Sequence, residues 1–172
     1  LDMNCVEKDF KKNLFDKLGR TYTSGRVTNI TKNYNGRGKC QSRNLCIRGC
    51  PYGAYFSSNS STLPAAEATG NMTLKTDSIV HSIIYDDEKN KATGVRVLDS
   101  ETLEMTEYYA RIIFLNASTI NSTLIMLNSK SRRFPNGFGN DSGELGHNIM
   151  DHHFKAGARA QIDGYEDYYY YG

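Results

Sequence analysis

Three cysteines in a short loop are the side chains of this 172-residue chain that are best suited to chemistry. They follow the spacing Cys40-x5-Cys46-x3-Cys50, and Pro51 comes directly after the last cysteine. Thiolates bind soft metals, and a tight loop can direct three sulfurs toward one point. The x3-Cys-Pro ending is similar to part of an iron–sulfur sequence run. The spacing therefore makes this loop a candidate site for a metal ion or an iron–sulfur cluster.

The same cysteines are also compatible with other states. Three thiols do not complete the four ligands of a structural zinc site, and Cys5 lies far away in the sequence. A disulfide within the loop is an alternative in an oxidising compartment, and so are three reduced thiols. If the thiolates do bind a cluster, Arg43 and Arg48 would offset their negative charge.

The charge balance narrows the classes of partner. The chain has 21 basic and 19 acidic residues, for a formal net charge of +2. These charges are interspersed, without the basic stripe that is typical of nucleic-acid binding. No apolar run approaches membrane-spanning length, and the start has no signal-peptide pattern. We therefore expect no nucleic-acid partner and no membrane span. Neither end has the features of a natural terminus, which indicates an interior piece of a longer protein.

The strongest structural pattern lies further along the chain. Residues 112–115 form an unbroken apolar run, typical of a strand that is covered on both faces in a parallel sheet. Small and polar residues follow, and Ser118 or Thr119 can cap a helix there. The apolar face predicted for this helix consists of Ile120, Leu124 and Leu127. A strand that leads into a capped helix places free N–H groups at a sheet edge, where cofactor phosphates bind.

The remaining patterns predict the elements that surround these two sites. Helices are expected over residues 6–18, ended by Gly19, and over residues 62–69, ended by Gly70. An extended segment is expected over residues 26–31, and strands over 72–76, 78–85, 94–98 and 104–109. The last three strands indicate an antiparallel meander. Strands fed by helices indicate an α/β fold, with the meander as an insertion.

Five phrases in this order resemble the glucose–methanol–choline (GMC) oxidoreductases, which are flavoproteins. They are GCPYGAYFSS (49–58), AAEATGNMTLKT (65–76), ATGVRV (92–97), IIFLNASTINSTL (112–124), and the stretch from FPNG to LGHNIMDH (134–152). The resemblance covers roughly residues 36–153.

The resemblance implies a partial Rossmann-like FAD-binding domain with an antiparallel β-meander insertion. Residues 1–145 would be the central part of that domain, including the cysteine loop (36–56) and the meander (78–110), and residues 146–172 would be the truncated start of a substrate domain. It also implies that Val80 lies beside the adenine of FAD, which it meets through its backbone. The residues implied near the same cofactor are Asn116, Ala117 and Ser118.

In function, the resemblance implies the central fragment of a flavin-dependent oxidoreductase that acts on CH–OH groups of an alcohol, sugar or polyol. Hydride would pass to FAD in the full-length enzyme. The family's Gly-x-Gly-x-x-Gly loop and its catalytic His have no counterpart in this sequence, so we expect an inactive fragment that lacks the catalytic base. Some membrane-linked bacterial members hold an iron–sulfur cluster in a cysteine loop here, which would pass electrons to a partner.

The sequence is also compatible with two other functions. The first is a metal-binding electron-transfer module, of the iron–sulfur type or another, built on Cys40, Cys46 and Cys50. The second is a non-catalytic α/β interaction domain.

Overall fold

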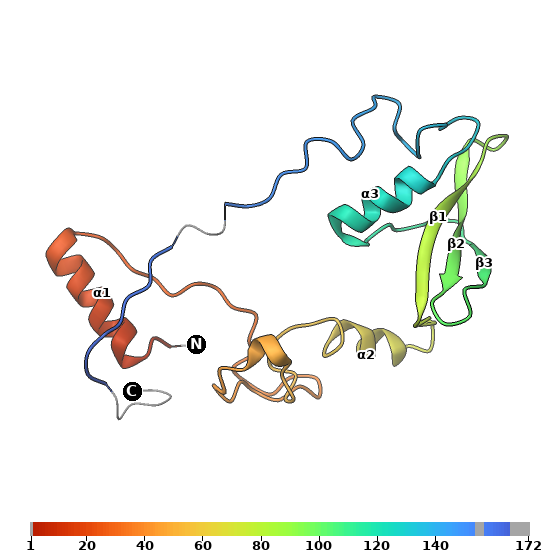
Figure 1. Ribbon diagram of the computed structural model, residues 1–172. Helices are drawn as coiled ribbons and strands as arrows, with labels where there is room; N and C mark the ends of the chain where they lie inside the picture. The colour runs from red at the N-terminus through yellow and green to blue at the C-terminus, as the bar shows by residue number, and fades with distance from the viewer. Residues whose placement is uncertain (1, 154–156, 166–172) are drawn as a thin grey trace. The chain divides into compact units, whose positions relative to one another are not determined.

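The computed structural model describes residues 2–153 and 157–165, and it divides into two compact units (Figure 1). Unit 1 consists of Leu1–Thr73 and Ala158–Gly172, and unit 2 of Leu74–Gly157. Unit 1 contains α1 (Cys5–Leu18), a short 3-10 helix (Cys46–Arg48) and α2 (Thr62–Glu67). Unit 2 contains β1 (Ser78–Asp86), β2 (Lys91–Asp99), β3 (Met105–Tyr109) and α3 (Ser118–Asn128).

Helix α1 has well-defined capping at both ends. The Asn4 side chain accepts the N–H of Glu7 at 2.9 Å, and the Glu7 carboxylate accepts the N–H of Asn4 at 2.9 Å. This reciprocal pair satisfies two amides that a helix start otherwise leaves unpaired. Gly19 ends the helix in the left-handed conformation, with φ 61°. The predicted helix over residues 6–18 and its stop at Gly19 are therefore confirmed.

The cysteine loop has little regular secondary structure and is held by main-chain hydrogen bonds. Ile30 N–H donates to the Ala54 carbonyl, and Phe56 N–H donates to the Thr28 carbonyl, both at 3.0 Å. Between them, Asn29 and Tyr55 form an isolated antiparallel bridge. The expected extended segment over residues 26–31 is thus present as one side of this pairing. The loop is therefore held by the pairing of two backbone segments, residues 28–30 and 54–56, and not by a sheet.

The side chain of Arg37 also stabilises the cysteine loop, through three hydrogen bonds. Its Nε donates to the Gly53 carbonyl at 2.7 Å, and its Nη2 donates to the carbonyl of the fully buried Ala54 at 3.3 Å. Its Nη1 donates to the Ser61 hydroxyl at 3.3 Å. The planar guanidinium fits this role because it presents several donors in a fixed geometry.

The three strands of unit 2 form an antiparallel sheet in the order β1-β2-β3, as the meander prediction requires. Asp86 and Asp99 start the two connecting turns, because each carboxylate accepts two backbone N–H groups shortly after it. In the register, Ile83 faces Val95 and Val97 faces Thr106. Helices combined with this sheet agree with the α/β class.

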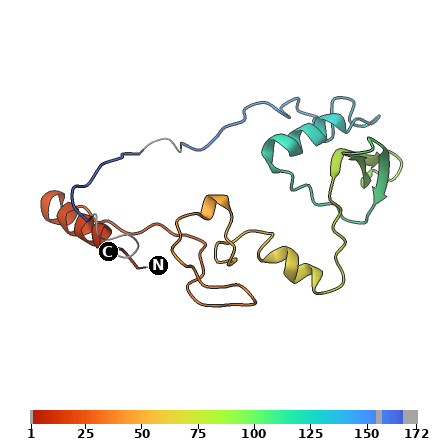
Figure 2. The ribbon, with the colours of Figure 1, turned by 60° about the horizontal axis from the view of Figure 1, so that its bottom comes forward.

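Helix α3 packs against β1, and Figure 2 shows the helix beside the sheet. The Ser129 hydroxyl makes the decisive contact. It accepts the N–H of Ile83 at 2.7 Å and donates to the Ile125 carbonyl at 2.6 Å, all within the buried part of the unit. The Asn128 amide donates to the His81 carbonyl at 3.4 Å. The small core of unit 2 consists of Ile83, Val97 and Ile125, with Ser82 and Ser129 also buried.

The helix over residues 118–128 is confirmed, but its predicted apolar face is wrong for Ile120 and Leu124, whereas Leu127 is half-buried. Ile120 is 71% exposed and Leu124 is 54% exposed, whereas Ile125 is buried. Ser129 lies on the same side of the helix as Ile125, and its hydroxyl bonds both to the Ile125 carbonyl and to the Ile83 N–H of β1. The predicted hydroxyl cap is also wrong, since the N-cap is Ala117 and no side chain bonds to the first amides.

Two predicted strands are also absent from the described structure. Residues 72–76 and 112–115 have no strand assignment, and Ile112 and Phe114 are 72% and 81% exposed. A strand exists only when a neighbour pairs with its N–H and C=O groups. Within residues 2–153 and 157–165, no segment forms such a ladder with either run. The apolar run therefore lacks the partners that its composition predicts.

An aromatic cluster holds the segment after α3 to the first hairpin. The rings of Tyr85, Phe134 and Phe138 lie 5.0 to 5.7 Å apart between centroids. The Asp87 carboxylate accepts the backbone N–H groups of Arg132 and Arg133, at 3.2 and 2.8 Å. This anchoring gives the irregular segment a defined position within unit 2.

None of the helices in the described part of the chain is both long enough and apolar enough to cross a membrane.

Candidate cysteine-lined redox site

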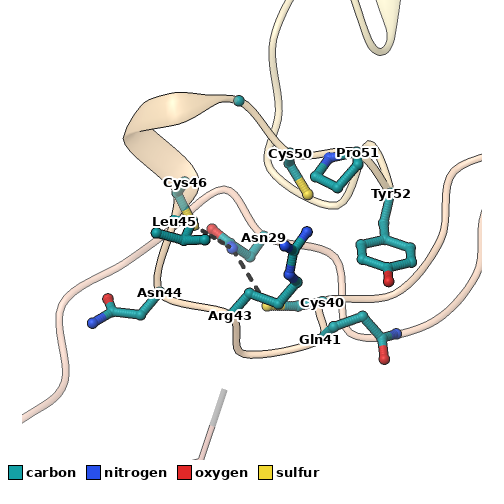
Figure 3. A pocket seen from close by; sticks show the side chains of 11 residues that line it. Asn29, Cys40, Gln41, Arg43, Asn44, Leu45, Cys46, Cys50, Pro51 and Tyr52 are labelled. Atoms are coloured by element: carbon teal, nitrogen blue, oxygen red, sulfur yellow. Dashed lines mark hydrogen bonds between the residues drawn. The ribbon is translucent and has the colours of Figure 1, made fainter.

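Cys40, Cys46 and Cys50 line the same pocket in unit 1, together with Asn29 and Arg43 (Figure 3). The cavity volume is about 30 Å³. The sequence prediction that the loop gathers these three side chains in one place agrees with this lining.

Each cysteine is placed by a different local feature. Cys40 is held by its backbone, because its N–H donates to the Ile30 carbonyl at 2.9 Å. Cys46 is the first residue of the 3-10 helix, and Gly49 leaves that helix with φ 93°. This positive φ is a conformation that residues with a Cβ rarely adopt. Cys50 then starts a tight turn, in which its carbonyl accepts the Gly53 N–H at 3.0 Å.

Asn29 is a functional candidate that the sequence did not single out. Its Nδ2 atom lies 3.6 Å from the sulfur of Cys40 and 3.7 Å from the sulfur of Cys46, in donor geometry toward both (Figure 3). No spacing rule connects this residue to the cysteines, which lie eleven and seventeen positions later. The extended segment predicted over residues 26–31 includes this residue.

The backbone around Cys50 favours the thiolate form. Hydrogen bonding from the backbone N–H of Tyr55 is the main cause that lowers the pKa of the Cys50 thiol below its ordinary 9.0, and burial opposes it. The N–H groups of Tyr52, Ala54 and Gly53 add to the lowering. Backbone donors stabilise a charged sulfur more than a neutral one. This turn therefore offers a preformed cradle for an anionic sulfur.

Two arginines belong to the same loop. Arg43 lines the pocket and places its guanidinium carbon 6.0 Å from the centre of the Tyr52 ring. Arg48 ends the 3-10 helix that begins at Cys46.

The arrangement does not match a site for a single metal ion. Among residues 2–153 and 157–165, no three His, Cys, Asp or Glu side chains converge closely enough to hold one ion. All four cysteines are free in the structure, so it contains no disulfide between them. Cys40, Cys46 and Cys50 are therefore free thiols that line one pocket.

The residues expected near FAD lie in unit 2. Val80 is half-buried in β1 opposite Val97, next to an irregularity in the register between Val80 and Ser82. The other three lie at the start of α3, where Asn116 is exposed, Ala117 is the N-cap, and Ser118 has φ 66°. Among the described residues, no hydrogen bond joins Val80 to this second group. Their role in cofactor binding stays a prediction.

Comparison with known proteins identifies the family. The chain matches the GMC oxidoreductase family over residues 7–154, which is most of its length, and it belongs to that family. It is 26% identical over 142 residues to the fructose dehydrogenase large subunit of Gluconobacter japonicus. This alignment covers 81% of this chain and 25% of that protein. It is also 30% identical over 106 residues to a 2-methyl-1,2-propanediol dehydrogenase of Mycolicibacterium austroafricanum, which covers 62% of this chain and 19% of that protein.

The family resemblance seen in the five sequence phrases is thus confirmed. The chain spans a quarter or less of the length of these two relatives.

Proposed function

We propose that this chain forms part of the Rossmann-like FAD-binding region of a dehydrogenase that oxidises a CH–OH group in a small alcohol, sugar or polyol. The family match over residues 7–154 is the observation that carries this proposal. The two relatives support the substrate class, because they are named as dehydrogenases of fructose and of 2-methyl-1,2-propanediol, which both bear hydroxyl groups. When bound, FAD would supply the chemistry by accepting a hydride from the substrate carbon.

The start of α3 has features that suit an anionic cofactor. No side chain bonds to the first amides of this helix, so their N–H groups are not used by a cap. Such N–H groups, together with the helix dipole, stabilise negative charge. We assign Asn116, Ala117 and Ser118 to this contact, and the backbone of Val80 to the adenine. These residues would bind and orient the cofactor, and none of them is assigned a proton transfer.

We also propose that the cysteine loop holds an iron–sulfur cluster through Cys40, Cys46 and Cys50. The donor chemistry fits a cluster better than a single ion. In a cluster the thiolates bind different irons, so their sulfurs do not need to converge on one point. Asn29 and the turn after Cys50 direct N–H groups at the sulfurs, which is the kind of contact that tunes such clusters. The loop would then pass electrons from the flavin toward an external acceptor protein.

The test uses the complete protein that contains this chain, purified without oxygen and analysed for flavin, iron and acid-labile sulfide. We expect all three, together with oxidation of at least one alcohol, sugar or polyol when a dye accepts the electrons. Protein without flavin, or without activity on any compound of this class, would contradict the dehydrogenase proposal. Iron and sulfide in a protein that never binds flavin would instead favour the separate electron-transfer module.

Two cysteine variants distinguish the role of the cluster from that of the flavin. We expect Cys50→Ser to lose iron and to slow electron transfer to the external acceptor more than tenfold, while the substrate still reduces the flavin. Cys5→Ser is the matched control, because Cys5 begins α1 and does not line the pocket. Unchanged iron in Cys50→Ser would contradict the assignment of this residue as a ligand.

A further inference from the structure

Asn29 directs one amide group at two of the three sulfurs. Its Nδ2 lies 3.6 Å from the Cys40 sulfur and 3.7 Å from the Cys46 sulfur. A side-chain amide carries two N–H donors, so it can donate to both sulfurs at once. The Cys40 sulfur also accepts the backbone N–H of Ser42 at 3.4 Å. The Asn29 side chain thus links Cys40 to Cys46 within the pocket (Figure 3).

The backbone of Asn29 is tied to the turn that faces the third sulfur. Asn29 pairs with Tyr55 in the isolated bridge, and its neighbours bond to the carbonyl of Ala54 and the N–H of Phe56. The backbone N–H of Tyr55 is in turn the largest cause of the lowered pKa of the Cys50 thiol. One residue therefore holds a side-chain contact with two sulfurs and a main-chain contact with the cradle of the third.

We infer that Asn29 is a positioning residue that raises the reduction potential of the cluster by donating two N–H···S hydrogen bonds. This inference rests on the cluster that is part of the proposed function. Uptake of one electron increases the negative charge on the sulfurs, and donors that point at them stabilise the reduced form. Contacts outside the ligand set commonly adjust metal sites in this way.

The experiment compares Asn29→Ala and Asn29→Asp with the unaltered protein, in the complete protein reconstituted anaerobically with iron and sulfide. Asn29→Asp keeps the shape of the side chain but replaces the donor with a carboxylate. Asn59→Ala is the control, because Asn59 is an exposed asparagine of the same unit that does not line the pocket. The readouts are iron and sulfide content and the potential, measured by mediated redox titration with electron paramagnetic resonance.

We expect Asn29→Ala to lower the potential by the equivalent of a tenfold change in the one-electron equilibrium, which is about 59 mV. Asn29→Asp should lower it further, and Asn59→Ala should leave it unchanged. Potentials equal to that of the unaltered protein in both Asn29 variants, with iron retained, would overturn the inference and leave the proposed cluster intact. Absence of iron from the unaltered protein would overturn both.

A third variant covers failure of the cluster to assemble. Asn29→Gln retains an amide donor on a longer side chain. If Asn29→Ala and Asn29→Asp lose iron while Asn29→Gln keeps it, the amide itself is required and the positioning role is supported. Loss of iron from all three variants would show that the site needs the shape of asparagine instead of its donors, and would overturn the inference.

Discussion

The two units of this chain are stabilised in different ways. Unit 2 has a sheet with regular register, a helix packed on it, and a small core around Ile83, Val97 and Ile125. The cysteine loop of unit 1 has Ala54 as its buried hydrophobic residue and is held by Arg37 and crossing main-chain bonds. Unit 2 is therefore stabilised mainly by apolar residues in periodic elements. The cysteine loop, which carries the candidate site, is stabilised mainly by specific polar contacts.

The largest expected effect breaks the sheet of unit 2. A Cβ at Gly94 would lie 2.4 Å from the Tyr108 carbonyl oxygen and 3.0 Å from the Tyr109 ring. Because the close neighbour is backbone, Gly94→Ala should force β2 and β3 apart and cost about 3 kcal/mol of unfolding free energy. Urea denaturation followed by circular dichroism measures this loss.

Gly25→Ala is the matched control for that change. An added Cβ at Gly25 meets no atom within 4 Å, and its φ is not in the positive range. We expect its stability to stay within about 0.5 kcal/mol of the unaltered chain. Equal stabilities for the two alanine variants would contradict the close approach between β2 and β3.

A second change tests the contact between α3 and β1. Ser129→Ala removes the acceptor of the buried Ile83 N–H, which should cost about 2 kcal/mol because a buried donor loses its partner. The same denaturation experiment measures it. In the control, Ser122→Ala, the hydroxyl makes no hydrogen bond among the described residues, and a neutral or slightly stabilising effect is expected. A cost for Ser122→Ala as large as that for Ser129→Ala would contradict this assignment.

The third change addresses the polar fastening of unit 1. Arg37→Ala removes the donors to Gly53, Ala54 and Ser61, and should lower the protection of the Ile30 and Cys40 amides by roughly tenfold, near 1.4 kcal/mol. Hydrogen–deuterium exchange measures this protection. Protection in the β1–β2 hairpin of unit 2 should not change. If the hairpin loosened as much as the loop, the two units would not be stabilised separately.

The smallest effect concerns pH. Hydrogen bonds from the backbone N–H of Thr102, and then of Glu101, lower the pKa of the Asp99 carboxyl below its ordinary 3.8. A lowered pKa means that the carboxylate stabilises the β2–β3 turn above the ordinary value, and that this support is lost as the pH falls through the folded-state pKa. Carboxyl carbon NMR should give a midpoint below 3.8 for Asp99. A midpoint at or above that value would rule out the turn contact.

Sequence patterns predicted the regular part of the fold well and the site only in outline. The glycine that ends α1 and the alternation in the meander are local signals, and the predicted helix and three strands are present. The apolar run at 112–115 failed because a strand depends on a partner elsewhere in the chain. The predicted face of α3 was wrong for Ile120 and Leu124, because residue spacing alone does not show which side of a helix meets the sheet.

For the candidate site, the cysteine spacing predicted that three thiols share a pocket, since all of them belong to one short loop. It could not predict Asn29, because that residue reaches the sulfurs through backbone pairing with Tyr55 across a long sequence separation. The direction of the amides toward Cys50 depends equally on the turn that follows it. Such contacts are set by loop geometry, for which residue spacing gives no rule.

The end of α3 also has a consequence for association between molecules. Ser129 and Asn128 occupy the Ile83 N–H and the His81 carbonyl on the outer side of β1. An outer strand with open groups at these positions would be a template for a strand from a second polypeptide. The two side chains close part of this edge, so the same residues that dock the helix protect the sheet from aggregation by strand addition.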